Sequence, residues 1–243
     1  ITVKLNVIDY SRYDVSEKER QEHALQYLSN ESQKAFDLNQ APLFRFPLIR
    51  IADGHHALGV FIHHILCDGL SARIFFRELS TAYESYMQGA EPNLAPLSLQ
   101  YTDYSRWQRT HFDQLSVQRD VAYWRRKLTA LPKLELGDKV CLQGEAQGDV
   151  HQFNVPGELM RRLDMLAKRF DVSRFAMFTS IYQVLLSAIS GQNDVYFTTP
   201  ATEREQNKLQ DLIGLFVNSI ALRQNVQNIK SFGEFVKHTK VHV

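Results

Sequence analysis

The sequence predicts a layered fold that mixes helices and strands, of the α/β or α+β class. Segments with the two-residue period of half-buried strands alternate with segments of helical period, several of which open on a serine and stop at a glycine. The chain has 243 residues, of which 44% are hydrophobic, so it can bury a sizeable core. Strands and helices mixed in this way argue for packed layers.

The first predicted element is a strand, and a capped helix follows it. Val3, Leu5 and Val7 alternate with polar or small residues, which is typical of a strand. Ser16 and Glu19 have the spacing of a capping box and predict the start of a helix. The inward face of this helix is predicted to carry Leu25, Leu28 and Ala35-Phe36.

A hairpin is predicted next. Residues 44–51 have the pattern of a strand, and Pro47, which has no N–H to donate, favours a sheet edge or a bulge. Asp53-Gly54 is a hairpin turn signal. The return strand is expected over residues 58–65.

Two helical regions and a linker follow the hairpin. Ser71 and Gly89 predict the start and the stop of a helix with apolar positions at helical spacing. Those positions are Ile74, Leu79, Ala82, Tyr83 and Tyr86. A second helical pattern runs over residues 101–128. Residues 129–149 are richer in Gly, Pro and polar residues, which predicts a crossover between two lobes.

The second half opens on a strand predicted near residues 150–155. A helix is expected from Glu158, and one side of it carries Leu159, Leu163, Leu166 and Phe170. The next helix, over residues 175–189, is capped by Ser173 and stops at Gly191. It is so apolar that we expect it to be mostly buried.

The last predicted elements are a short strand, an apolar segment and a helix. The strand covers residues 195–199, and the apolar segment covers residues 213–223. Ser231 and Glu234 have the spacing of a second capping box, which opens the final helix.

Composition excludes several classes of function. There are 28 basic and 27 acidic residues and no basic run with interleaved aromatics, so neither nucleic acid nor a membrane is expected as a partner. Cys67 and Cys141 are too few for a disulfide framework, which favours a reducing, cytoplasmic location. We find no apolar run long enough to span a bilayer and no signal peptide. The chain opens inside a strand pattern and stops inside a helix pattern, so we expect a piece of a longer polypeptide.

The most informative segment is His63-His64-Ile65-Leu66-Cys67-Asp68-Gly69. On a strand the two imidazoles point to opposite faces, so one enters a site only if the other packs inward or is hydrogen-bonded. His64 is the candidate general base, because histidine moves protons near neutral pH; the alternative is a core histidine with no catalytic role. Gly69 is expected to supply a backbone geometry or a close approach that a Cβ would block.

The other residues of this segment allow several interpretations. Asp68 could orient an imidazole, ligate a metal or pair with a buried arginine that holds the turn, and the last is preferred. A metal site is disfavoured because adjacent strand histidines cannot both face one ion and no HExxH helix is present. Cys67 has no neighbour that clearly lowers its pKa, so it is not expected to be a nucleophile. The sequence contains no GxSxG elbow, Walker loop or dinucleotide fingerprint.

Two further polar features lie in apolar surroundings. An aromatic cluster with one carboxylate is expected to pack a helix onto the first lobe; it comprises Tyr101, Asp103, Tyr104 and Trp107. Asn218-Ser219 breaks an apolar run and either satisfies buried backbone groups or lines a cleft.

Three motifs in order make the chain resemble a condensation domain of a nonribosomal peptide synthetase. Residues 63–69 match the HHxxxDG motif of that family. Residues 101–107 resemble its YxDFAVW motif, with tyrosine for phenylalanine and Ser-Arg for Ala-Val. Residues 213–219 and the later Arg223 resemble its IGxFVNT segment and the arginine that follows. The resemblance covers nearly the whole chain but only the middle of the longer domain.

The resemblance implies a chloramphenicol acetyltransferase-like fold, an α/β (α+β) two-layer sandwich. Residues 1–128 would form an N-terminal lobe that is incomplete at its start, residues 129–149 a crossover linker, and residues 150–243 part of a C-terminal lobe. The implied activity is amide formation between a donor acyl or peptidyl thioester and an acceptor aminoacyl thioester. Donor and acceptor peptidyl carrier proteins would present both substrates on phosphopantetheine, beside adenylation or other synthetase domains, with no cofactor or metal bound directly.

The resemblance also implies roles for single residues. His64 would accept the proton of the amine, or hold the amine and stabilise the tetrahedral intermediate, with His63 and Gly69 as supporting motif residues. Asp68 resembles a structural aspartate salt-bridged to an arginine of an early motif that would precede Ile1. Without that arginine Asp68 would be an unpaired buried charge, at a cost of about 3–5 kcal/mol, and much of the second lobe would also be missing. We therefore expect the isolated chain to be inactive unless other segments complement it. An epimerization domain and a non-catalytic platform that docks carrier proteins are the alternatives.

Overall fold

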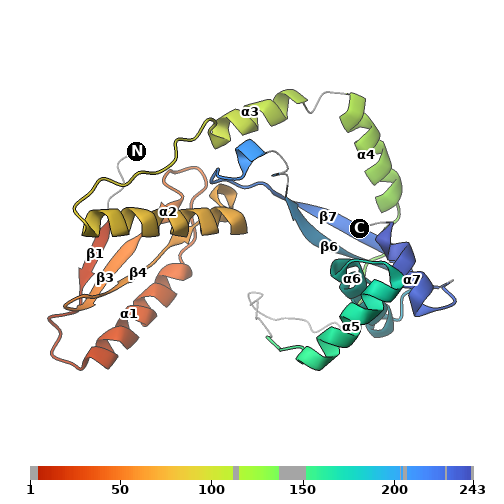
Figure 1. Cartoon of the computed structure of the whole chain (residues 1–243), viewed down its shortest axis with the longest axis horizontal. Helices are drawn as coiled ribbons and strands as arrows, with labels where there is room; N and C mark the ends of the chain where they lie inside the picture. The colour runs from red at the N-terminus through yellow and green to blue at the C-terminus, as the bar shows by residue number, and fades with distance from the viewer. Residues whose placement is uncertain are drawn as a thin grey trace. The chain divides into compact units, whose positions relative to one another are not determined.

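The computed structural model describes residues 5–111, 115–136, 152–202, 204, 207–227 and 229–241. The chain divides into two compact units, each of which mixes helices with β-strands (Figure 1), as the predicted α/β class requires. Ile1–Gln108 and Thr202–Val217 form the first unit, and Arg109–Ala201 and Asn218–Val243 form the second. The sequence did not predict a boundary at residue 108, nor the return of residues 202–217 to the first unit. Of the expected linker, residues 129–136 contain no helix or strand, and residues 137–149 lie outside the described part.

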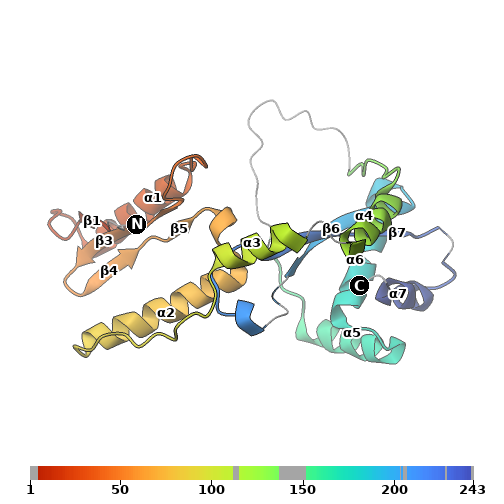
Figure 2. The same ribbon diagram turned by 90° about the horizontal axis from the view of Figure 1, so that it is seen from above.

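The first unit is built on a three-stranded sheet of order β1-β3-β4 (Figures 1 and 2). β1 (Asn6–Asp9) runs parallel to β3 (Pro47–Ala52), and β4 (His55–Leu58) runs antiparallel to β3. Helix α1 (Glu17–Ser32) packs on this sheet and buries Ala24 against Ile49 and Ile51. The predicted capping box of α1 is confirmed, because Ser16 and Glu19 bond each other's backbone N–H.

The apolar positions from which the first strand and the first helix were predicted are only partly buried. Ile8 packs on the core, whereas Leu5 and Val7 are 48% and 61% exposed and Val3 lies outside the described residues. On α1, Leu28 packs inward as predicted, but Leu25 is 58% exposed. Ala35-Phe36 follows the end of the helix at Ser32.

Pro47 occupies the central strand of the sheet rather than the predicted edge. It is the first residue of β3, a position that needs no ladder N–H. The Pro47 carbonyl accepts a hydrogen bond from the Gly59 N–H at 2.8 Å. The irregularity in the pairing of β3 with β4 is a register shift between Arg50 and Ala52, so it does not lie at Pro47, where the sequence suggested a bulge.

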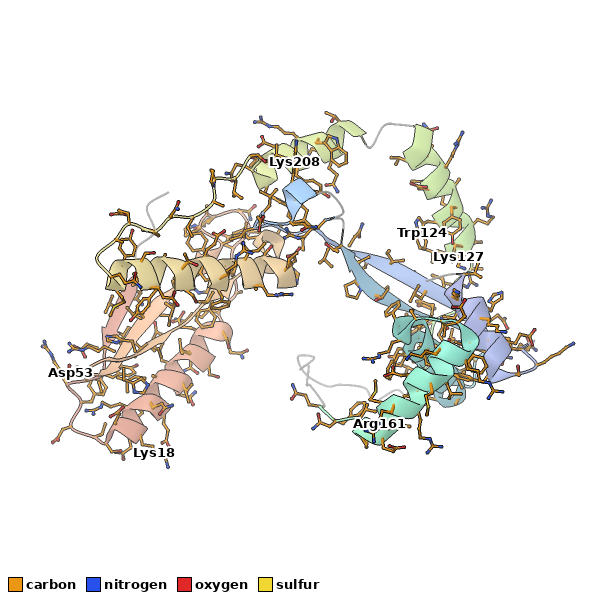
Figure 3. The ribbon with its side chains drawn as sticks, viewed as in Figure 1. Lys18, Asp53, Trp124, Lys127, Arg161 and Lys208 are labelled. Carbon is orange, nitrogen blue, oxygen red and sulfur yellow. The ribbon has the colours of Figure 1, made fainter. Side chains whose placement is uncertain are left out.

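The hairpin turn is confirmed, but the return strand is shorter than predicted. Gly54 has φ +72°, and Figure 3 shows Asp53 at the tip of the hairpin. β4 ends at Leu58, and β5 (Phe61–Ile62) pairs with β2 (Phe44–Arg45) in a separate two-stranded sheet. His63 and His64 therefore follow the strand, and the strand period that predicted opposite faces does not apply to them.

Two helices continue the first unit. α2 (Gly69–Met87) is capped by Asp68 rather than by Ser71, and Gly89 at φ +71° follows its end. Of the apolar positions at helical spacing Ile74 is buried, but the other large side chains are exposed by 37%, 66% and 61%: Leu79, Tyr83 and Tyr86. α3 (Tyr101–His111) begins the helical pattern predicted over residues 101–128, and a second helix covers Leu115–Leu128; residues 112–114 lie outside the described part.

The second unit combines four helices of the described part with the strand pair β6 (Asp194–Thr202) and β7 (Val217–Asn225). The helices are α4 (Leu115–Leu128), α5 (Gly157–Phe170), α6 (Arg174–Ser190) and α7 (Phe232–Lys240). Ser173 and Ser231 cap α6 and α7 as predicted. Residues 152–155 form no strand, contrary to prediction, and residues 150–151 lie outside the described part.

Helix α6 is only half buried, although the sequence predicted a mostly buried helix. Met177 packs with Ala167 of α5 and Val236 of α7 in a small core. The opposite side of α6 is exposed by 45–56% at Phe175, Tyr182, Leu185 and Ile189. Among the described helices, none is by itself long and apolar enough to cross a membrane. Only α5 and α6 taken together reach that length and hydropathy, and they are bent by 103° relative to each other.

Candidate functional site

The histidine pair lies in a short turn that connects β5 to α2. His63 begins this turn, and its backbone N–H donates to the Leu43 carbonyl at 2.9 Å. Its side-chain Nδ1 accepts the Ile65 N–H at 3.1 Å, and its ring packs edge-on against Phe36 at 6.0 Å. One ring nitrogen of His63 is therefore occupied as an acceptor, which identifies His63 as the histidine that holds the turn.

His64 is placed differently from its neighbour. It is the first residue of a 3₁₀ turn, His64–Leu66, and its carbonyl accepts the Cys67 N–H at 3.2 Å. The residue is exposed, and no described residue makes a hydrogen bond to its ring. The turn thus fixes the backbone of His64 without a hydrogen bond from the described residues to its ring.

Asp68 follows this turn and begins α2. Its side chain is 1% exposed and accepts hydrogen bonds from the N–H groups of Ser71 (2.8 Å) and Phe216 (3.1 Å). Burial alone would raise the pKa of the Asp68 carboxyl. These hydrogen bonds and the Arg204 guanidinium outweigh burial, so the pKa lies below its ordinary value.

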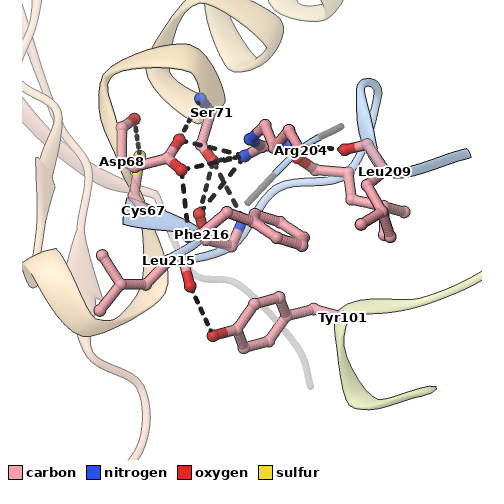
Figure 4. A network of polar contacts seen from close by, with 10 residues as sticks. Cys67, Asp68, Ser71, Tyr101, Arg204, Leu209, Leu215 and Phe216 are labelled. Carbon is pink, nitrogen blue, oxygen red and sulfur yellow. Dashed lines mark hydrogen bonds and ion pairs between the residues drawn. The ribbon is translucent and has the colours of Figure 1, made fainter. Parts of the chain in front are cut away.

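The partner of Asp68 is Arg204, which corrects the expectation that its arginine would precede Ile1. Nη2 of Arg204 lies 3.0 Å and 3.3 Å from the two carboxylate oxygens, and the arginine side chain is 2% exposed (Figure 4). Nη1 donates to the carbonyls of Leu209 and Leu212, and the guanidinium lies 4.0 Å from the centre of the Phe216 ring. The unpaired charge, one of the two grounds on which we predicted inactivity, is therefore absent from the described structure.

Sequence reasoning missed Arg204 because nothing local marks it. It is one of 28 basic residues and lies 136 positions after Asp68, so no spacing relates the two. Only the return of residues 202–217 to the first unit brings them together.

The predicted aromatic cluster does pack in a core, but the buried partners of Tyr104 there are Leu209, Leu212 and Phe216, which the sequence had placed in the second lobe. Tyr104 is buried with its ring 4.7 Å from that of Phe216, and the Tyr101 hydroxyl donates to the Leu215 carbonyl at 2.9 Å. Asp103 is exposed rather than buried and accepts the Gln100 N–H at the start of α3. Trp107, at the outer end of the cluster, is 46% exposed.

The close approach predicted for Gly69 occurs at another glycine. A Cβ on Gly69 would have no heavy atom within 4 Å, and its φ is not in the left-handed region. A Cβ on Gly214 would lie 2.0 Å from the Tyr101 ring. Gly214 is thus the glycine that permits close packing at this site.

The second candidate pair, Asn218 and Ser219, belongs to the second unit. Both are exposed on β7, and the Asn218 side chain accepts the Ser219 N–H at 2.8 Å. The idea that they satisfy buried backbone groups is therefore not supported. Arg223 further along β7 is held by Asp194, whose hydrogen bonds raise the pKa of the guanidinium.

Neither a thiol nucleophile nor a metal site is evident in the described residues. Burial, followed by the nearby Asp68 charge, raises the pKa of Cys67, which disfavours the thiolate. Within the described ranges, no group of three or more His, Cys, Asp or Glu residues is placed to hold a metal ion.

Comparisons with known proteins agree with the motifs. The sequence model of the Condensation domain matches residues 1–243. Bacitracin synthase 3 of Bacillus licheniformis is 33% identical over 220 residues, which is 89% of this chain and 3% of that protein. Malpinin synthetase of Mortierella alpina is 34% identical over 220 residues, which is 88% of this chain and 3% of that protein.

Solved structures support the same fold. The first condensation domain of the calcium-dependent antibiotic synthetase aligns with a TM-score of 0.70 at 22% identity, covering 98% of this chain and 54% of that one. The X-domain from teicoplanin biosynthesis aligns with a TM-score of 0.77 at 22% identity, covering 99% and 53%. This chain therefore spans about half the length of these solved structures and a small part of the two synthetases. On its sequence, motifs and fold, the chain belongs to the condensation-domain family of nonribosomal peptide synthetases.

Proposed function

We propose that this chain carries the catalytic histidine of a domain that joins a donor acyl or peptidyl thioester to the amine of an acceptor aminoacyl thioester. The observation that carries the proposal is the contrast between His64 and its neighbours. His63 and Asp68 are both committed to internal contacts, whereas the His64 ring is exposed on a turn fixed by its backbone. Such a ring can meet a substrate without first breaking a structural contact.

The proposed reaction is an acyl transfer from sulfur to nitrogen. The lone pair of the acceptor amine attacks the thioester carbonyl, and the tetrahedral intermediate collapses with loss of the donor thiolate. The amine proton must leave the nitrogen, and a His64 ring nitrogen either accepts it or holds the amine while the intermediate forms. A positioned general base typically supplies about 10²–10⁴-fold in rate.

The substrates and partners proposed with this reaction are carrier proteins and their phosphopantetheine thioesters. No cofactor is required by the reaction itself, because the thioester already activates the acyl group. That Asn218 and Ser219 line a cleft stays a prediction; both residues are exposed on β7 of the second unit. Adenylation or other synthetase domains would supply the loaded carriers.

The test measures amide formation by the full-length protein that contains these residues, with separately loaded donor and acceptor carrier proteins. His64→Ala should lower the single-turnover rate by about 10²-fold or more, the loss expected for a general base. His56→Ala is the matched control, since His56 is also an exposed histidine of the first unit. Unchanged amide formation in the His64 variant would contradict a catalytic imidazole.

The same assay separates the alternatives. An epimerization domain would bring solvent deuterium into the α-position of an aminoacyl thioester without forming an amide. A docking platform would bind loaded carriers and turn over neither substrate. Either result in the unsubstituted protein would replace the proposal.

A further inference from the structure

Ser71 has the most completely engaged side-chain hydroxyl at the site. The residue is 0% exposed, and its Oγ donates to the Gly214 carbonyl at 2.8 Å. The same oxygen accepts the Gly214 N–H at 3.0 Å and Nη2 of Arg204 at 2.7 Å. A hydroxyl has one donor and two acceptor sites, so all three are used.

These contacts fix one short segment of backbone from two sides. Ser71 bonds both the N–H and the carbonyl of Gly214, while the Tyr101 ring lies against the position where a Cβ would stand. The Tyr101 hydroxyl bonds the next carbonyl, that of Leu215. Figure 4 shows Ser71 and Tyr101 on opposite sides of this segment. The position of residues 214–216 is therefore set by α2 and α3 together.

The position of this segment matters to the histidine turn through Asp68. The Phe216 N–H binds one carboxylate oxygen of Asp68, and Arg204 binds both. Asp68 caps α2 directly after Cys67, whose N–H closes the turn that begins at His64. A displacement of residues 214–216 would thus change the hydrogen bonds that fix the end of the turn.

We infer that Ser71 is a positioning residue for His64, acting through Gly214, Arg204 and Asp68. This inference rests on the proposed function for its kinetic consequence, but not for its structural one. Ser71 touches no reacting atom in this scheme. Its hydroxyl fixes the segment that orders Asp68, and Asp68 in turn orders the end of the histidine turn.

The experiment compares Ser71→Ala with Ser180→Ala in the full-length protein. Ser180 is the matched control, because it is also 0% exposed and its hydroxyl makes two buried hydrogen bonds in the second unit. Hydrogen exchange measured by mass spectrometry follows peptides covering residues 63–70 and 207–217. Single-turnover amide formation is measured at increasing acceptor carrier concentration, with His64→Ala as the reference for loss of catalysis.

In Ser71→Ala we expect hydrogen exchange to rise about tenfold or more in both peptides, because local opening no longer has to break the buried hydrogen bonds of this hydroxyl. The kcat should fall about tenfold to a hundredfold with KM within about threefold, because carrier binding is untouched while His64 is misplaced. Ser180→Ala should leave the hydrogen exchange of both peptides unchanged, even if it lowers the melting temperature. Its kcat should stay within about threefold of that of the unsubstituted protein.

Two results would overturn the inference. One is faster hydrogen exchange in residues 207–217 while exchange in residues 63–70 is unchanged. This would mean that Ser71 holds residues 214–216 in place but does not affect the histidine turn. The other is an equal fall of kcat in Ser71→Ala and Ser180→Ala, which would indicate general destabilisation. Failure of the proposed function is distinguishable, because His64→Ala would then match the unsubstituted protein while the exchange comparison still tests Ser71.

Discussion

Replacing Arg204 by methionine removes the cation from the buried pair while keeping an apolar stem of similar length. Asp68 would keep the N–H groups of Ser71 and Phe216 but lose the guanidinium that faces both of its oxygens. Breaking a buried pair by removing one partner costs about 3–5 kcal/mol. The carbonyls of Leu209 and Leu212 also lose their donor, so we expect the upper part of this range.

The matched control is Arg77→Met. Arg77 pairs with Asp211 at a similar distance, 3.0 Å, but the two side chains are 59% and 61% exposed. An exposed pair contributes about 0–1 kcal/mol, so this variant should be close to the unsubstituted protein. Urea unfolding followed by circular dichroism and by tryptophan fluorescence gives the free energy of unfolding for each variant.

A double-mutant cycle then tests whether the loss comes from the pair itself. Asp68→Asn in the Arg204→Met background should cost less than it does alone, with a coupling energy of about 0.5–3 kcal/mol. The reasoning fails if Arg204→Met and Arg77→Met cost the same within error, or if the two substitutions at Asp68 and Arg204 are additive.

Two more predictions concern the same site. Gly214→Ala should destabilise by about 1–3 kcal/mol in the same urea assay, because its Cβ would meet the Tyr101 ring; Gly69→Ala, whose Cβ meets nothing, should stay within about 0.5 kcal/mol. Equal effects of the two alanines would contradict the packing at Gly214. Hydrogen bonds hold the pKa of Asp68 below its ordinary value in the folded protein despite burial. The Asp68 carboxyl therefore binds a proton more tightly in the unfolded chain than in the folded protein. The stability that Asp68 contributes is then full above about pH 5 and is lost as the pH falls through the lower folded pKa. Urea midpoints measured from pH 6 to pH 3 should therefore fall less in Asp68→Asn than in the unsubstituted protein; parallel curves would refute the assignment.

Local signals in the sequence predicted local structure well. The serine caps at Ser16, Ser173 and Ser231 and the turn at Gly54 each depend on a few neighbouring residues, and all are confirmed. The inward faces of helices were predicted less well. Periodicity identifies an apolar stripe, but it does not say which neighbour covers the stripe, and Leu25, Tyr83 and Leu185 are exposed.

The histidine turn shows how local and distant information combine at the site. Its motif could be found from residues 63–69 alone, but the strand period misplaced the pair because β5 ends at Ile62. Apart from the nearby Ser71 N–H, the contacts that fix Asp68 come from Arg204 and Phe216, more than 130 positions away. Both belong to a segment that returns to the first unit, where Gly214 bonds Ser71. Hydrogen bonds of this kind carry no periodic signature, because each depends on how two distant backbones meet rather than on a repeat within either. For the same reason a single substitution at Gly214 is expected to act on α2, although no local rule connects the two.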